Sequence, residues 1–80
     1  MEKPNFLPGR YRHFKGGEYQ LLFVARHSES GEWYVVYKAL YGEGGFFVRP
    51  AAMWAEQVVR GDYCGPRFTY MGEAPYEAAD

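Results

Sequence analysis

The segment that most constrains the fold is Trp33 to Pro50, WYVVYKALYGEGGFFVRP, because it joins two strand-like patterns through a glycine-rich turn. From Trp33 to Tyr41 the chain is rich in β-branched and aromatic residues, which favour a strand over a helix. The GEGG sequence supplies glycines that tolerate the positive φ angles of tight turns, and Phe46 to Arg49 begins the next strand. The segment therefore predicts a β-hairpin at the centre of the fold.

Two further strands are expected before this hairpin. Residues 10–15 and 19–27 both alternate with a period of two residues, and a Lys-Gly-Gly-Glu turn separates them. We expect the first strand to lie at a sheet edge. The second is apolar on both faces, so it should be buried on both sides or strongly bent, with Leu21, Phe23 and His27 on one face. Strands two to four should form an antiparallel meander.

After the hairpin, Pro50 to Glu56 predicts one short helical turn with Trp54 as its anchor, since proline suits the first helical position. The helix could extend to Arg60, but valines in residues 57–60 are better strand formers, and we prefer a strand there. Residues 61–66 are predicted to be a loop and residues 67–71 a last short strand.

The chain of 80 residues is long enough for one domain. We divide it into a leader (residues 1–8), a barrel domain (residues 9–71) and an acidic tail (residues 72–80). The pattern predicts a mainly β fold, a small SH3-like antiparallel barrel, closed or partly open, of five to six short strands. Its aromatic content of 20% supplies the apolar area that so short a chain needs for a core.

Charge and cysteine content exclude several classes of protein. The net charge of −1 argues against a strongly basic surface that binds nucleic acid non-specifically. A single cysteine, Cys64, excludes an internal disulfide framework and suits a reducing compartment, so we expect a cytoplasmic protein. No apolar run is long enough for a membrane span. Two histidines and one cysteine at unhelpful spacing predict no metal site, and no cofactor is expected.

The order of the motifs GRYRHFKGGEY, VARHSE, VVYKALYGEGGFFVRP, MWAEQV and PRFTY resembles the uncharacterised bacterial family named domain of unknown function 1653. The resemblance runs from Gly9 to about Tyr70, implies an SH3-like barrel, and implies no activity. Trp54 stands where the family more often has phenylalanine, and Lys38 where arginine is common. The family pattern otherwise falls on Tyr11, His13, Lys15, Gly16, Tyr19, His27, Ser28, Glu29, Tyr37, Leu40, Tyr41, Arg49 and Pro50.

Our first functional hypothesis is a non-enzymatic binding module for a peptide or an anionic small ligand. Arg49 stands just before a proline, on a rigid element, where its planar fork suits a carboxylate or phosphate. The competing explanation is a structural ion pair with Glu43, Glu56 or Glu18, or stacking on Tyr41. The candidate ligand-binding residues are Tyr11, His13, His27, Tyr37, Tyr41, Arg49 and Trp54.

Two alternatives stay open. A nucleic-acid-binding barrel would use a basic and aromatic patch containing Arg10, Arg12, Lys15 and Arg26. An enzyme would use His13 or His27 as a general base, although no catalytic set is assigned. The partner is otherwise an unknown protein or anionic small molecule, no membrane is involved, and the chain is expected to be a monomer or a homodimer.

Overall fold

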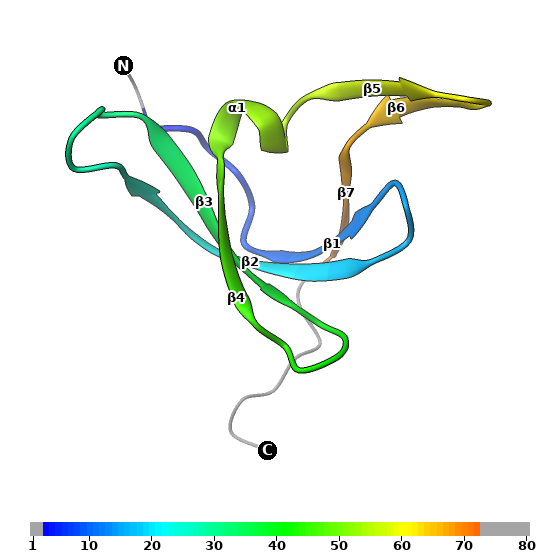
Figure 1. Cartoon of the computed structure of the whole chain (residues 1–80), viewed down its shortest axis with the longest axis horizontal. Helices are drawn as coiled ribbons and strands as arrows, with labels where there is room; N and C mark the ends of the chain where they lie inside the picture. Colours follow the sequence, from blue (N-terminus) through cyan, green and yellow to red (C-terminus); the bar gives the residue numbers. More distant parts are fainter. Residues whose placement is uncertain (1–2, 73–80) are drawn as a thin grey trace.

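The computed structural model describes residues 3–72 and contains seven strands and one helical turn (Figure 1). Among these residues no helix has the length and apolar character needed to cross a membrane. The elements in chain order are β1 (Gly9–His13), β2 (Glu18–Arg26), β3 (Trp33–Ala39), β4 (Phe46–Pro50), α1 (Ala51–Trp54), β5 (Gln57–Arg60), β6 (Tyr63–Pro66) and β7 (Phe68–Gly72).

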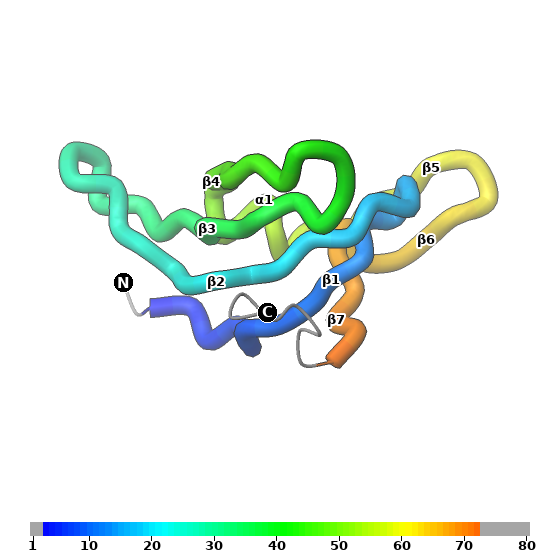
Figure 2. Tube along the Cα trace, turned by 90° about the horizontal axis from the view of Figure 1, so that it is seen from below, coloured from blue at the N-terminus to red at the C-terminus, as the bar shows by residue number. Residues whose placement is uncertain are grey.

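Five strands form one antiparallel sheet in the order β4-β3-β2-β1-β7, and β5 with β6 forms a separate two-stranded ribbon. In two perpendicular views the β2–β3 turn and the β5–β6 ribbon project at opposite ends of the molecule (Figures 1 and 2). Within residues 3–72 the end strands β4 and β7 are not hydrogen-bonded to each other. The chain is therefore mainly β, and its sheet is open rather than a closed barrel.

The predicted hairpin, meander and helical turn are confirmed. β1 to β4 pair in sequence order, and the central hairpin pairs Val35 with Arg49 and Tyr37 with Phe47. The helical turn follows Pro50, which has φ −54°, and ends within the predicted range. Residues 57–60 form a strand, as preferred.

Two predictions about strands are wrong because the deciding partners lie elsewhere in the chain. β1 was expected at an edge, but it lies between β2 and β7, since the last strand returns to it. The expected loop at residues 61–66 contains β6, which pairs with β5 across the two-residue turn Gly61-Asp62. Gly61 has φ +56°, a left-handed conformation that favours glycine.

The face pattern of β2 is also corrected. The pairing of β2 with β3 shifts between Leu21 and Phe23, so Leu22 is an extra residue that forms a β-bulge. Beyond the bulge the alternation is inverted: Phe23 is 57% exposed, while Val24 packs against the core. The apolar character of both faces thus reflects a bend, one of the two predicted explanations, rather than burial on both sides.

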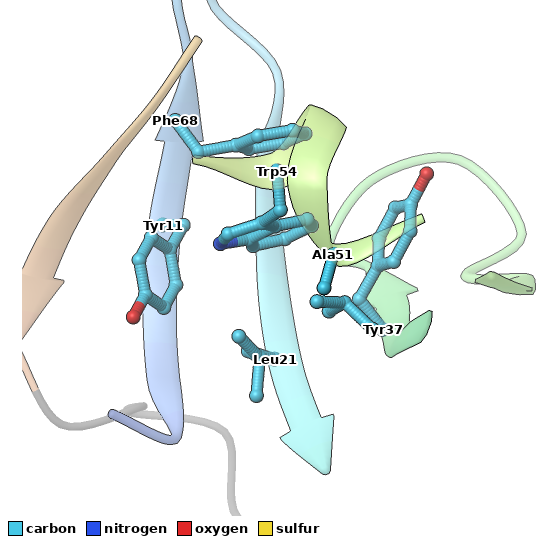
Figure 3. Close-up of a cluster of buried hydrophobic side chains, with 7 residues drawn as sticks. Tyr11, Leu21, Tyr37, Ala51, Trp54 and Phe68 are labelled. Atoms are coloured by element: carbon cyan, nitrogen blue, oxygen red, sulfur yellow. The ribbon is translucent and has the colours of Figure 1, made fainter. Parts of the chain in front are cut away.

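The core lies on the inner face of the sheet, beneath α1 and the start of β7 (Figure 3). Trp54 and Phe68 stack with ring centroids 3.8 Å apart and an interplanar angle of 6°. Tyr11 and Tyr37 contact Trp54 from either side, at centroid distances of 5.2 and 4.9 Å. The buried core cluster consists of Tyr11, Leu21, Val35, Tyr37, Ala51, Trp54 and Phe68.

The predicted leader is partly described, and the predicted tail is not. Phe6 packs against the core, and the Tyr11 hydroxyl donates a hydrogen bond of 2.8 Å to the Leu7 carbonyl. Residues 3–8 therefore lie against the sheet. Residues 73–80, nearly all of the predicted acidic tail, lie outside the described residues.

We expect Phe68→Ala to lower the free energy of unfolding by about 3–5 kcal/mol, because it removes a buried ring and leaves a cavity beside Trp54. The matched control is Phe23→Ala, which removes the same side chain from an exposed position and should cost less than about 1 kcal/mol. Urea denaturation followed by tryptophan fluorescence measures both. Equal losses in the two variants would contradict the assignment of the core.

Candidate functional site

The Phe68 ring carries a cluster of aromatic and cationic side chains at one end of the inner face. Besides Trp54, it contacts the rings of His13 at 4.9 Å, Tyr19 at 5.8 Å and Tyr37 at 6.2 Å between centroids. The guanidinium carbon of Arg49 lies 5.5 Å from its centroid, within the range of a cation–π contact. We call His13, Tyr19, Tyr41 and Arg49, together with Phe68, the Arg49 site.

Arg49 reaches this site from β4, one residue before the strand ends. Its backbone pairs with Val35, and its Nε lies 3.4 Å from the Tyr37 hydroxyl, a long hydrogen bond. Within residues 3–72 no carboxylate forms an ion pair with Arg49; two of its predicted partners, Glu18 and Glu56, pair with other arginines. The guanidinium is thus fixed against aromatic rings, and its terminal nitrogens are free of acidic partners in the described part of the chain.

His13 is held at the end of β1 as a hydrogen-bond acceptor at one nitrogen. Its Nδ1 accepts a bond of 3.1 Å from the Lys15 backbone N–H, so the neutral ring carries its proton on Nε2. Burial lowers the pKa of His13, and the positive charges of Arg49, Arg67 and Lys15 lower it further. A neutral His13 therefore contributes an Nε2–H donor in a region of positive potential.

Two tyrosines complete the site. The hydroxyls of Tyr19 and Tyr41 are 2.7 Å apart and share a hydrogen bond. Burial, followed by the contact with Tyr41, raises the pKa of Tyr19 to about 12, so this hydroxyl stays protonated at neutral pH. One of the two protons forms the shared bond, and the other is available to an external acceptor. Tyr41, at 54% exposure, offers a ring face to a ligand.

The structure brings together only part of the predicted ligand-binding set. His13, Tyr41 and Arg49 belong to the Arg49 site. Tyr11, Tyr37 and Trp54 are buried in the core, with exposed fractions of 7%, 6% and 2%, so they support the site from beneath and leave little surface for a ligand. His27 follows the opposite end of β2, a strand of nine residues that spans about 30 Å.

His27 has a structural role in the turn between β2 and β3. Its Nδ1 accepts hydrogen bonds from the backbone N–H groups of Glu29 and Ser30, both at 3.1 Å, and Ser30 Oγ accepts one from Glu32 N–H. Neither histidine is hydrogen-bonded to a carboxylate within residues 3–72, so the general-base hypothesis gains no support from geometry.

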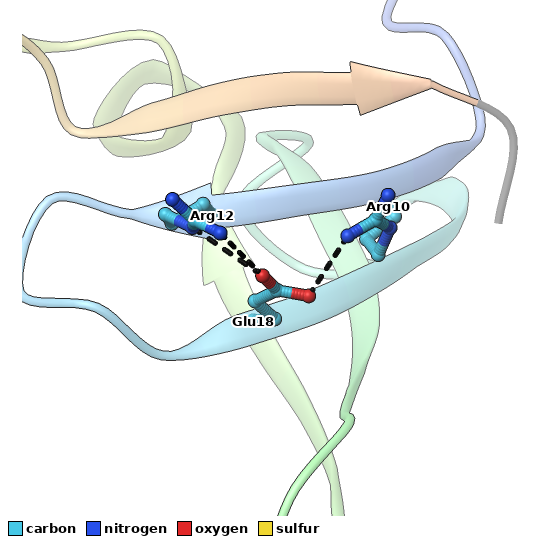
Figure 4. Close-up of polar contacts among 3 residues, drawn as sticks. All are labelled: Arg10, Arg12 and Glu18. Atoms are coloured by element: carbon cyan, nitrogen blue, oxygen red, sulfur yellow. Dashed lines mark hydrogen bonds and ion pairs between the residues drawn. The ribbon is translucent and has the colours of Figure 1, made fainter. Parts of the chain in front are cut away.

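The residues of the predicted basic patch do not form one surface. On the outer face, Arg10 and Arg12 both bind Glu18, with N–O distances of 3.1 and 2.9 Å, and these bonds lower the pKa of Glu18 (Figure 4). Arg26 lies at the far end of β2, over the Trp33 ring and bonded to a turn carbonyl. Two of the four cations thus share one carboxylate, which cancels one of their two charges, and a third is remote from them.

No metal centre is evident in the described part of the chain: no three histidine, cysteine or acidic side chains between residues 3 and 72 are grouped to hold an ion. Cys64 lies exposed on β6.

Sequence reasoning missed Tyr19 and Phe68 as site residues. The proximity of Tyr19 to Tyr41 depends on the pairing of β2 with β3, which the local pattern does not reveal. Phe68 reaches the site only because β7 pairs with β1. The PRFTY motif placed an aromatic residue in the last strand, and no local pattern showed which rings it would contact.

Replacing Arg49 should raise the pKa of His13, because a nearby positive charge that disfavours protonation is removed. We expect this in Arg49→Gln, whereas Arg26→Gln, at the far end of β2, should leave the value unchanged. NMR titration of the His13 ring protons measures it, with His27 as an internal reference. An unchanged His13 pKa in Arg49→Gln would show that the two side chains do not interact.

The lowered pKa of His13 also makes the free energy of unfolding depend on pH. Because the folded pKa of His13 lies below the ordinary value of 6.5, the native state binds fewer protons than the unfolded state in the interval between the two values. The stability that neutral His13 contributes to the fold is therefore fully present above about pH 6.5. It is lost as the pH falls through the pKa of His13 in the folded state. Arg49→Gln should narrow this interval.

Comparisons with known proteins agree with the fold and leave activity open. No curated protein matches the chain. The chain is similar to the crystal structure of a DUF1653 protein from Bordetella bronchiseptica, with a TM-score of 0.81 and 41% sequence identity. The superposition covers 91% of this chain and 96% of that chain. The model of the protein family of unknown function DUF1653 matches residues 9–70. The chain is therefore a member of the DUF1653 family.

Proposed function

We propose that this domain is a binding module, and that the Arg49 site holds the anionic group of its ligand. The observation that carries the proposal is the state of Arg49: its guanidinium is held against Phe68 and beside Tyr37, yet no ion pair with a carboxylate engages it within residues 3–72. A fixed guanidinium loses little side-chain freedom on binding, which favours its use for carboxylate or phosphate.

The neighbouring groups suit the same chemistry. The His13 Nε2–H and one hydroxyl proton of the Tyr19–Tyr41 pair are donors, and the charged groups that lower the His13 pKa are all cations. An anion would therefore meet hydrogen-bond donors and a positive potential. Exposed rings at the rim, Tyr41 and the 49% exposed Phe47, would contact an apolar part of the ligand.

The fold offers a rationale for this placement. We propose that the domain is an open variant of the SH3-like barrel, in which a four-stranded meander, one helical turn and a last strand paired with the first enclose a small core. Small barrels commonly present binding surfaces of this kind, although fold alone does not fix function. The nucleic-acid alternative has less support, because Glu18 engages both Arg10 and Arg12.

Binding of simple anions tests the proposal. We expect benzoate, phenylacetate or phenyl phosphate to shift the NMR signals of His13 and of the Arg49 side chain. Arg49→Gln should weaken that binding at least tenfold, which corresponds to about 1.4 kcal/mol. Arg26→Gln is the matched control and should bind like the unaltered protein, because it removes the same charge from the far end of β2.

Two results would contradict the proposal that Arg49 binds the anionic group of a ligand. If none of these anions perturbs His13 or Arg49, or if Arg49→Gln binds them as well as the unaltered protein does, the proposal fails. Binding of a single-stranded oligonucleotide with affinity that falls steeply with salt would instead support the nucleic-acid alternative.

A further inference from the structure

β4 is an end strand of the sheet, and no strand among residues 3–72 pairs with its second edge. In the order β4-β3-β2-β1-β7 it has β3 as its one hydrogen-bonded neighbour among residues 3–72. An unpaired strand edge presents backbone N–H and C=O groups that can pair with another extended chain. The chemistry of β4 therefore depends on which backbone groups point outward and which side chains flank them.

The register with β3 shows which groups point outward. Ala39 N–H donates to the Gly45 carbonyl at 2.9 Å, which is the bond expected beside a non-hydrogen-bonded pair of Lys38 and Phe46, and the pattern alternates along an antiparallel ladder. By that alternation Phe47 and Arg49, opposite Tyr37 and Val35, direct their backbone groups toward β3. Phe46 and Val48 direct theirs toward the free edge, and Pro50, which has no N–H, ends it.

The side chains of β4 leave this edge apolar on both faces. Phe46, Phe47 and Val48 are 67%, 49% and 62% exposed. Proteins usually protect such an edge with charges, bulges or a covering segment. Here the three consecutive apolar residues are followed by Arg49, whose side chain lies on the inner face with that of Phe47, as their contacts with Phe68 and Tyr37 show.

We propose that β4 binds an extended peptide segment of a partner protein by strand addition, with an acidic side chain of the peptide on Arg49. Backbone hydrogen bonds to Phe46 and Val48 supply affinity, and alternate side chains supply specificity, as in other strand-addition complexes. The inference rests on the proposed function, because it identifies the anion held by Arg49 as a peptide carboxylate.

The geometry predicts the sequence of the peptide. In antiparallel pairing, an acidic residue lies opposite Arg49 and the next three lie opposite Val48, Phe47 and Phe46. These three should be apolar to match the exposed side chains. The expected pattern is one acidic residue followed by three apolar residues.

A second copy of this chain fits the edge less well. Two copies could pair about a two-fold axis, with Phe46 of one copy opposite Val48 of the other. In that arrangement both outward-pointing residues form backbone hydrogen bonds between the copies. The arrangement also places Gly45 of the second copy opposite Arg49, which leaves the guanidinium without an acidic counterpart. Charge complementarity therefore favours a separate peptide.

The test uses fluorescence anisotropy with a dye-labelled peptide, acetyl-KTEVFVTK-amide, in which glutamate would face Arg49. We expect acetyl-KTQVFVTK-amide to bind about tenfold more weakly, and Arg49→Gln to abolish the difference between the two peptides. N-methylation of both valines should weaken binding at least tenfold, because those N–H groups face β4. N-methylation of the phenylalanine is the matched control, since its N–H points away.

A variant of the protein tests the same backbone hydrogen bonds by removing the N–H of Val48 on β4. Val48→Pro removes an outward N–H that makes no bond to β3, so it should leave the sheet intact by circular dichroism and weaken the peptide at least tenfold. Val48→Thr, which keeps the N–H, should bind within about twofold of the unaltered protein. The N-methylated peptides decide the question even if Val48→Pro does not fold.

The outcomes separate the two proposals. If benzoate or phenyl phosphate binds through Arg49 while the glutamate peptide binds no better than a scrambled one, strand addition fails and the anion site stands. If both N-methylated peptides bind equally, the ladder is not used and strand addition fails. If the chain sediments as a dimer that Val48→Pro dissociates, and no peptide binds, the edge belongs to a second copy and the proposal is overturned.

Discussion

The parallel stack of Trp54 on Phe68 is the contact on which the rest of the structure depends. Trp54 belongs to the only helical turn of the described chain, and Phe68 is the first residue of β7. Their contact therefore fixes the returning end of the chain against the element that follows the central hairpin. Tyr11 and Tyr37, from β1 and β3, pack against the same indole, so four elements meet at one pair of rings.

This arrangement explains how a chain of 80 residues sustains a core. Aromatic side chains each remove a large apolar area from water, so a few of them replace the many aliphatic residues of a larger domain. One part of this aromatic cluster, the ring of Phe68, contacts His13 and Arg49 of the candidate site. Arg49 and His13 therefore rest on side chains that cannot move without disturbing the core, which gives the candidate site its rigidity.

Local pattern was sufficient to predict the elements whose partners are close in sequence. The hairpin from Trp33 to Pro50 and the turn that follows it carried clear β-branched, glycine and proline signals, and the structure has them. The ribbon of β5 and β6 also carried a signal, a Gly-Asp pair after two valines, which the prediction of a loop at residues 61–66 overlooked. The bulge at Leu22 had no such signal, since apolar residues on both faces are compatible with burial as well as with bending.

The residues of the candidate site also differ in whether local sequence was sufficient to predict their positions. Arg49 was singled out because its neighbours in sequence hold it on a rigid strand, and its guanidinium lies over the ring of Phe68, whereas Tyr41 was the stacking partner considered from the sequence. The central position of β1 and the role of Phe68 both result from the pairing of residues about sixty positions apart, which periodicity does not encode. The positions of the cations along the sequence likewise suggested a basic patch, whereas the pairing of β1 with β2 places Glu18 between two of its arginines.

The late position of Phe68 in the chain has a consequence for synthesis. His13, Tyr19, Tyr41 and Arg49 all precede Phe68 in the chain, so they are synthesised before the ring that supports their side chains. A nascent chain that ends before residue 68 has the hairpin and its arginine without the surface beneath them. The Arg49 site should therefore be complete only when β7 pairs with β1.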